Sequence, residues 1–341
     1  MFLLIFWILI FILSLTVLVK SSDWFIESAE KIALALKISP FIIGVTIVAV
    51  GTSFPELASS LAAVLKGANE IVVANVVGSN IANIFLIVGL SAVAGGILIV
   101  KRSLIDLDAP LLAASTALLV FVSLDKTINL GEAVLLLIAF LMYIFYTISQ
   151  RQKEAETTPE IREILPEEEI MTVLPSRIER REEEAKTISS SEKINLKVIF
   201  FLILGLVGIV IGADYTIESV VKVAEILKIL PGLIGITAVA VGTSLPELMV
   251  SVRAAFQKKY EISLGNIFGS NIFNGLVVTA LPILIKPLVL DTATFYVGLP
   301  FLGIATTLFI ISGISRRIHK WEGIFYLILY CLFIAKLFNW F

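Results

Sequence analysis

The stretch "VAVGTSFPELASS", Val48 to Ser60, places one carboxylate, Glu56, inside an otherwise apolar run. An ionised carboxylate is costly in hydrocarbon unless a partner neutralises it. A second stretch, "VAVGTSLPELMVS", Val239 to Ser251, repeats the pattern with Glu247. Because the chain keeps this costly arrangement twice, the pattern predicts a site in which something compensates both charges.

The composition is that of a membrane protein. Of the 341 residues, 58% are apolar and 16% charged, whereas soluble domains have about 45–50% apolar and about 25% charged residues. Ten apolar runs are long enough to cross a bilayer, and the sequence therefore predicts an all-α integral membrane protein. The predicted spans are 2–36, 40–66, 71–98, 109–124, 129–149, 196–227, 231–257, 262–286, 293–313 and 322–340.

Charged residues concentrate in one segment. Residues 150–195 contain twelve Glu and eight Lys or Arg, and we interpret them as a loop between two membrane repeats, 1–149 and 196–341. If the N-terminus lies outside, 19 of the 26 Lys and Arg fall on the cytoplasmic side. The positive-inside rule then predicts both termini outside and the loop 150–195 in the cytoplasm.

The two halves of the chain resemble each other. Residues 23–83 align without gaps to 214–274 at a constant offset of 191, with 32 identities in 61 positions. Each half has five predicted spans, an odd number, so the second half must enter the membrane with opposite polarity. Such inverted-topology repeats bind their substrates near the midplane, between discontinuous helices.

The repeated motif has the chemistry of a cation site. Pro55 has no N–H, so the carbonyl of Gly51 loses its helical partner and the helix is expected to break there. Freed carbonyls at membrane depth are tolerated where they line protein or water. Carbonyls, hydroxyls and the Glu56 carboxylate converging on one point would suit a hard cation such as Ca²⁺. The second copy would supply a matching half-site around Glu247.

Two further segments carry polar residues at helical spacing. "ANVVGSNIAN", Ala74 to Asn83, and "GNIFGSNIFN", Gly265 to Asn274, each place Asn, Ser and Asn four residues apart. This spacing keeps the three side chains on one helical stripe. They could face the cation site, or they could only form hydrogen bonds between neighbouring helices, as small polar residues do in membranes.

The doubled GTS-x-PE and x-N-x-x-GSN-x-x-N motifs resemble those of the sodium/calcium exchanger family of cation/calcium antiporters. The resemblance implies a ten-helix fold with four cation sites, exchanging three Na⁺ for one Ca²⁺ by alternating access, with helices broken at the GTS-x-PE motifs. Because the chain resembles the minimal prokaryotic type of the family, the resemblance also implies a prokaryotic plasma membrane as its location. It further implies the ligands. Calcium would be held by Glu56 and Glu247 with the carbonyls of Thr52 and Thr243, sodium by Ser53, Ser244, Ser79, Ser270 and the carbonyls of Ala49 and Ala240, and the centre would be completed by Asn83 and Asn274.

The neutral amides refine this expectation. Potassium-dependent members of the family carry Asp at the position matching Asn274, so two neutral residues, Asn83 and Asn274, favour a potassium-independent exchanger. With two ionised Glu, bound Ca²⁺ leaves the site neutral and three Na⁺ leave a charge of +1. The cycle would therefore move net charge across the membrane.

Two other functions, proton/calcium antiport and intramembrane proteolysis, are alternatives to sodium/calcium exchange. A proton/calcium antiporter could use the same two Glu, because buried carboxylates can carry protons. An intramembrane serine protease would need a nearby His, but the single His319 lies among basic residues at the edge of a span, so we do not expect an enzyme. We expect no cofactor, no nucleic acid and no obligate protein partner; the partners are Na⁺, Ca²⁺ and the lipid bilayer.

Two acidic pairs also recur between the halves. Asp23 and Glu27 match Asp214 and Glu218, each pair four residues apart. They could line an ion entry path, but a hydrogen-bonding role in the helix is the simpler interpretation.

Overall fold

The structure is a computed structural model that describes residues 2–36, 40–65, 67–100, 108–154, 195–227 and 244–338. It is helical throughout, apart from two short ribbons of two strands each. Most of the predicted loop 150–195 and the segment 228–243, which includes Ala240 and Thr243, lie outside the described residues.

The helices of the first half are α1 (Phe2–Ala35), α2 (Pro40–Ile43), η1 (Gly44–Val48), α3 (Ala49–Thr52), α4 (Phe54–Leu65), α5 (Glu70–Ile81), η2 (Ala82–Val88), α6 (Gly89–Gly95), α7 (Ala109–Val122) and α8 (Leu130–Glu154). Those of the second half are α10 (Leu196–Ile226), α12 (Leu245–Phe256), α13 (Tyr260–Phe273), η5 (Asn274–Val278), α14 (Thr279–Ile283), η6 (Thr294–Gly298), α15 (Leu299–Ile314) and α16 (Lys320–Leu337).

Seven helices in the described part of the chain are long and apolar enough to cross a membrane. They coincide with seven of the ten predicted spans, with ends that differ by a few residues, and α7 is a shorter apolar helix within an eighth. The total of ten spans stays a prediction. The seven helices are Leu3–Ala35, Pro40–Leu65, Glu70–Gly95, Leu130–Thr147, Leu196–Val223, Tyr260–Ile283 and Thr294–Ile314.

The helix that carries Glu56 is interrupted at a single residue. Ser53 separates α3 from α4 with φ −87° and ψ 7°. Ser244, its counterpart 191 residues later, precedes α12 with φ −86° and ψ 7°. The two copies of the motif therefore share one local backbone geometry directly before the Pro-Glu pair.

Wider π-helical turns occur in the helices that carry the Asn-Ser-Asn stripes. Asn83 lies in η2, and its counterpart Asn274 is the first residue of η5. Such turns are rare and frequently mark functional sites. These turns could not be predicted, since hydropathy does not distinguish hydrogen bonds to the fourth residue from those to the fifth.

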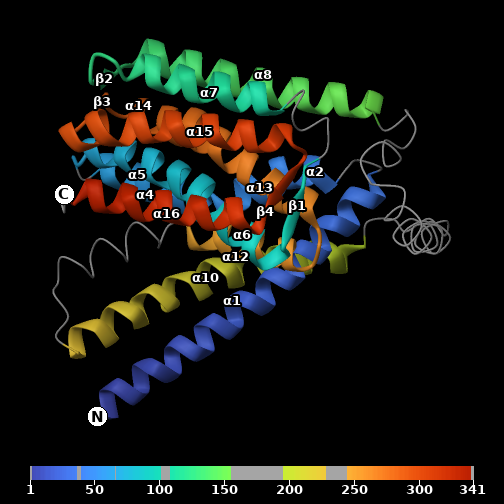
Figure 1. The fold of residues 1–341 in the computed structure, drawn as a ribbon. Helices are drawn as coiled ribbons and strands as arrows, with labels where there is room; N and C mark the ends of the chain where they lie inside the picture. Colours follow the sequence, from blue (N-terminus) through green and yellow to red (C-terminus); the bar gives the residue numbers. More distant parts are fainter. Residues whose placement is uncertain are drawn as a thin grey trace.

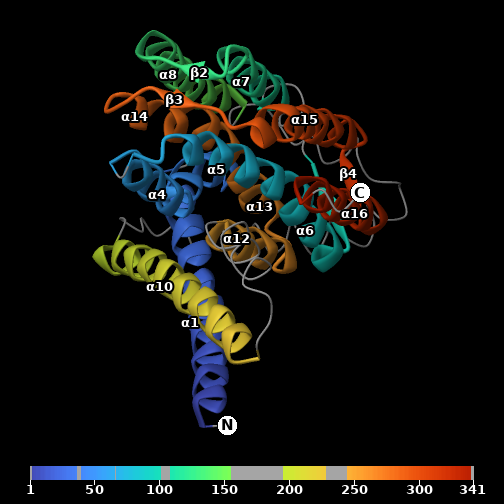
Figure 2. The ribbon, with the colours of Figure 1, turned by 90° about the vertical axis from the view of Figure 1, so that its left-hand side faces the viewer.

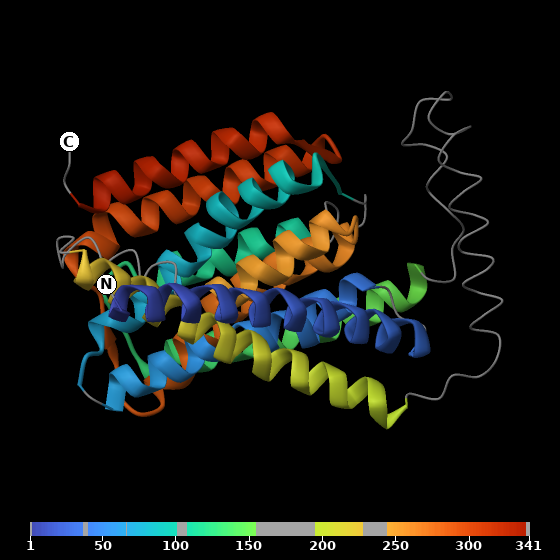
Figure 3. The same cartoon turned by 90° about the horizontal axis from the view of Figure 1, so that it is seen from below.

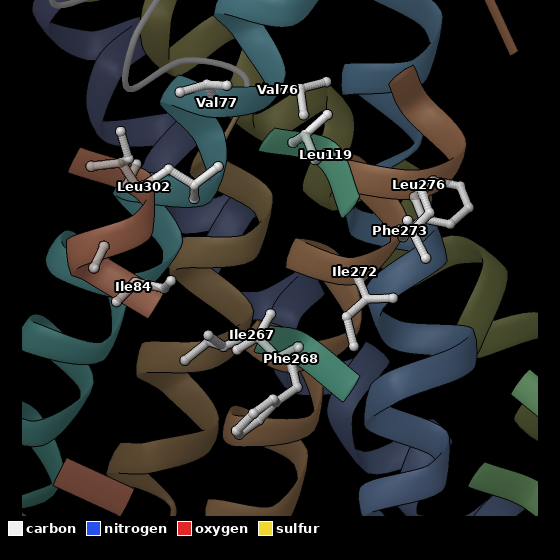
Figure 4. Packing of buried hydrophobic residues seen from close by; sticks show 14 of the residues in the cluster. Val76, Val77, Ile84, Leu119, Ile267, Phe268, Ile272, Phe273, Leu276 and Leu302 are labelled. Carbon is white, nitrogen blue, oxygen red and sulfur yellow. The ribbon is translucent and has the colours of Figure 1, made fainter. Parts of the chain in front are cut away.

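Helix α13 lies in the centre of the fold. Every residue from Ile262 to Phe273 is buried, as expected for a helix that is enclosed on all sides. Figure 4 shows its side chains Ile267, Phe268 and Ile272 within the main hydrophobic cluster. This core fixes the position of the polar stripe of α13, which begins with Asn266 and Ser270, relative to the neighbouring helices.

Glycines let α13 approach the broken helix of the first half closely. A methyl group added at Gly265 would lie 2.8 Å from the carbonyl oxygen of Phe41. One added at Gly269 would lie 2.6 Å from Cβ of Ala49 and would also overlap the carbonyl oxygen of Val45. Neither position has room for a larger side chain unless the backbone moves.

We therefore expect Gly269→Ala to destabilise the protein by about 1–3 kcal/mol, the usual cost of overpacking. Thermal unfolding in detergent would measure this as a lower midpoint. Gly303→Ala in α15 is the matched control, because no described atom lies within 4 Å of its added methyl group. Equal midpoints for the two variants would contradict the close packing of α13 against η1 and α3.

Helices α1 and α10 form a pair at one edge of the bundle, and α7 and α8 lie at the opposite edge (Figure 1; Figure 2). Seen from below, α1 and α10 cross each other in front of the other helices (Figure 3). Gly205 of α10 packs against Phe25 of α1, and Gly212 packs against Leu18, so the two helices run antiparallel. Small residues commonly allow such close contact between membrane helices.

The C-terminal half of α1 is tied to the second half of the chain by a half-buried ion pair. Arg253 donates from Nε to Oδ1 of Asp23 at 2.6 Å and from Nη2 to Oδ2 at 3.0 Å. Gln257 donates to the same carboxylate at 2.7 Å. The hydrogen-bonding interpretation of Asp23 thus fits the structure, whereas its counterpart Asp214 is exposed.

The four strands pair between the two halves. β1 (Ile97–Ile99) pairs antiparallel with β4 (Arg317–His319), and β2 (Thr127–Ile128) pairs with β3 (Leu288–Val289). Each ribbon therefore joins a connection of the first half to a connection of the second half.

Candidate cation-binding site

Two carboxylates are buried in the interior of the bundle. Glu56 lies in the first turn of α4 and Glu247 in the first turn of α12, and each is 1% exposed. Each motif places its carboxylate there because Pro is the second residue of the helix and Glu follows it directly. Ser53, three residues before Glu56, contacts Glu247, so the fold brings the two motifs of the repeat into one region.

The carboxylates are poorly supplied with hydrogen bonds. Neither oxygen of Glu56 has a described partner, and neither does Oε2 of Glu247. Oε1 of Glu247 accepts a hydrogen bond from the hydroxyl of Ser53 at 2.7 Å. This bond joins the motif of one half to the motif of the other, so the two half-sites meet.

Further buried polar groups have no hydrogen-bond partner among the described residues. At the predicted ligand positions they include the amide atoms Oδ1 and Nδ2 of Asn83 and Asn274 and the hydroxyls of Ser244 and Ser270. Buried polar groups are nearly always paired, so each exception calls for an explanation. A bound cation would explain the free oxygens, because it would accept electron density from all of them at once.

One predicted ligand, the carbonyl of Ala49, already has hydrogen-bond partners. The carbonyl oxygen of Ala49 accepts from the backbone N–H of Ser53 at 3.0 Å and from the hydroxyl of Thr52 at 3.3 Å. A cation at this carbonyl would have to displace the hydroxyl. Ser79 is buried at 3% exposure, and its counterpart Ser270 has a free hydroxyl. Ala240 and Thr243 lie outside the described residues.

Asn266, the first residue of the second stripe, forms hydrogen bonds with other protein groups. Asn266 is 0% exposed and forms hydrogen bonds with Thr52, Ser251 and the backbone of Glu247. Its position one turn before Ser270, on the same stripe, was visible in the sequence. Its partners were not, because Thr52 is 214 residues away along the chain.

The donor set is made of oxygen atoms. In the described part of the chain, no group of three or more His, Cys, Asp or Glu side chains gathers as a metal cluster. A cation in this region would therefore be held by two carboxylates together with neutral amide, hydroxyl and carbonyl oxygens. Such ligands favour hard cations over the softer transition metals.

Comparison with known proteins finds one protein family that matches both halves of the chain. The family model described as "Sodium/calcium exchanger protein" matches residues 6–149 and 197–339. The chain is 37% identical over 347 residues to the sodium/calcium exchanger MaX1 of Methanosarcina acetivorans, covering 97% of this chain and 98% of that protein. It is 33% identical to the uncharacterized membrane protein MJ0091 of Methanocaldococcus jannaschii, covering 96% of each.

Solved structures share the fold. The structure of the exchanger NCX_Mj soaked with zero Na⁺ and Ca²⁺ matches with a TM-score of 0.78 at 31% identity, covering 98% of this chain and 99% of that one. The same exchanger soaked with 2.5 mM Na⁺ and 0.1 mM Ca²⁺ matches with a TM-score of 0.78 at 30% identity.

Proposed function

Since the chain belongs to the sodium/calcium exchanger protein family, we propose that it is a secondary antiporter that exchanges three Na⁺ for one Ca²⁺ without K⁺. The observation that carries this proposal is the pair of buried carboxylates, Glu56 and Glu247, three of whose four oxygens have no described partner. The names of the relatives, a sodium/calcium exchanger and a structure soaked with Na⁺ and Ca²⁺, support these two ions as substrates.

Calcium suits the centre of the site. Two carboxylates neutralise one divalent cation, which removes the main cost of burying them. Asn83 and Asn274 would add neutral amide oxygens, and the Thr52 and Thr243 carbonyls would complete a shell of six to eight oxygens, as Ca²⁺ prefers.

Sodium would occupy positions beside the carboxylates. Its ligands would be Ser53, Ser244, Ser79, Ser270 and the carbonyls of Ala49 and Ala240. The Ser53 hydroxyl that contacts Glu247 in this structure would turn its oxygen to the ion when sodium binds. Since Asn83 and Asn274 carry no charge, the site holds two negative charges, which favours exchange without K⁺.

Alternating access would use two inverted five-helix repeats. Contacts between residues at repeat-equivalent positions support this arrangement. Asn80 donates to the carbonyl oxygen of Asn271, 191 residues later, at 2.9 Å. In both strand ribbons, β1–β4 and β2–β3, a connection of the first half pairs with a connection of the second half. Helices α1 and α10 pack in a second, smaller hydrophobic cluster, so we expect this pair to slide when access changes.

Flux into vesicles tests the proposal and separates it from proton/calcium exchange. Purified protein is placed in vesicles loaded with Na⁺, with K⁺ or with a pH gradient, and ⁴⁵Ca²⁺ entry into Na⁺-free buffer is followed. We expect uptake from Na⁺-loaded vesicles only. Equal uptake with the pH gradient would assign proton/calcium exchange, and the absence of any coupled uptake would contradict antiport.

A further inference from the structure

Asn266 of α13 connects the two half-sites through a single side chain. Its Oδ1 accepts the hydroxyl of Thr52 at 3.0 Å. Its Nδ2 donates to the hydroxyl of Ser251 at 2.8 Å and, over a longer 3.4 Å, to the backbone carbonyl of Glu247. Thr52 belongs to the first repeat, and the other two belong to the second.

Asn266 differs in this respect from the other buried amides of the stripes. Asn83 and Asn274 have no described partner for either amide atom, so their oxygens are available to an ion. The acceptor and both donor hydrogens of Asn266 are used by protein groups, and the side chain is 0% exposed. Its bonds to a hydroxyl donor and a carbonyl acceptor also fix which amide atom is oxygen.

The helix that carries Asn266 is held rigidly in place. Gly265 directly before it and Gly269 one turn after it pack against the backbone of η1 and the start of α3. The three hydrogen bonds therefore act from a fixed point in the centre of the fold. Any change in them would alter the separation of Thr52 from the first turn of α12.

We propose that Asn266 is a positioning residue that sets calcium affinity without contacting the ion. By accepting the Thr52 hydroxyl it holds Thr52 in one orientation, so that the Thr52 backbone carbonyl keeps a fixed position from which to meet an ion. By donating to Ser251 and the Glu247 carbonyl, it fixes the turn from which the Glu247 carboxylate reaches the site. This proposal rests on the proposed exchange function.

The test measures KM and kcat for Na⁺-driven ⁴⁵Ca²⁺ uptake in Asn266→Leu, Thr52→Val and the double variant. Leu and Val keep the side-chain volume but cannot form the hydrogen bonds. We expect each single change to raise the KM for Ca²⁺ about tenfold, as for an unpaired buried polar group. The KM of the double variant should not exceed the higher KM of the two single variants, because both changes remove the hydrogen bond between Thr52 and Asn266.

Asn69→Leu is the matched control. Asn69 also forms a hydrogen bond between the halves, from Nδ2 to the carbonyl oxygen of Pro287 at 3.0 Å, but away from the carboxylates. We expect this variant to lose thermal stability and keep the wild-type KM. Thr52→Ser, which restores the hydroxyl, should return the KM to the wild-type value.

Three outcomes would overturn the proposal while leaving exchange intact. The first is a wild-type KM in Asn266→Leu, and the second is equal KM changes in Asn69→Leu and Asn266→Leu. The third is KM effects of Asn266→Leu and Thr52→Val that multiply in the double variant. If Asn266→Leu does not fold, Thr52→Val and Ser251→Ala test the same bonds from the other side. Absence of Na⁺-driven uptake in the wild-type protein would instead refute the proposed function.

Discussion

Glu56→Gln and Glu247→Gln are each expected to abolish calcium binding and exchange. Gln keeps the shape of the side chain and removes one of the two charges that balance a divalent cation. Removing one partner of a buried charge pair costs about 3–5 kcal/mol, which corresponds to a loss of roughly 100- to 1,000-fold or more in affinity. Equilibrium binding of ⁴⁵Ca²⁺ to purified protein measures this directly, and vesicle uptake measures its effect on transport.

Glu70→Gln is the matched control for this prediction. Glu70 lies in the first turn of α5, as Glu56 lies in the first turn of α4, but its side chain is exposed. We expect wild-type calcium affinity in this variant. Retained affinity in Glu56→Gln or Glu247→Gln, with normal folding, would place the calcium site elsewhere.

The second large effect is that of membrane potential on calcium accumulation. Exchange of three Na⁺ for one Ca²⁺ moves one net charge per cycle, and this is worth about 2.3 kcal/mol per 100 mV. At a fixed Na⁺ gradient, the equilibrium calcium ratio across the vesicle should therefore shift by about 40- to 50-fold per 100 mV. An imposed K⁺ diffusion potential with valinomycin would supply the voltage.

The sign of this effect follows from the direction of charge movement. When Na⁺ leaves the vesicle and Ca²⁺ enters, one net positive charge leaves. A positive interior should thus raise calcium uptake, and a negative interior should lower it. A calcium ratio that does not change with voltage would indicate an electroneutral exchange of two Na⁺ for one Ca²⁺.

The repeat and its motif were the parts of the site that the sequence could predict. The constant offset of 191 identifies Glu56 and Glu247 as equivalent, and burying a carboxylate twice in apolar sequence predicts a compensating partner. The structure places both side chains in the interior, and the Ser53 hydroxyl of the first motif contacts Glu247 of the second. Because these signals are local and repeated, they can be read without knowledge of the fold.

Contacts between distant segments could not be predicted. The Ser53 hydroxyl meets Glu247 across 194 residues, and Asp23 meets Arg253 across 230. The position 191 residues before Arg253 is Ala62, so the repeat itself gave no indication of this ion pair. The π-helical turns at Asn83 and Asn274 and the two strand ribbons also depend on packing between segments that periodicity does not report.

Competition between sodium and calcium for the purified protein tests the central claim most directly, since antiport requires that the two ions do not occupy the Glu56–Glu247 site together. We expect one Ca²⁺ to bind per chain and to be displaced by Na⁺ with a steep concentration dependence, because several Na⁺ replace it. K⁺ at equal ionic strength should not displace it. Calcium that stays bound at saturating Na⁺, or that K⁺ displaces equally well, would contradict the account.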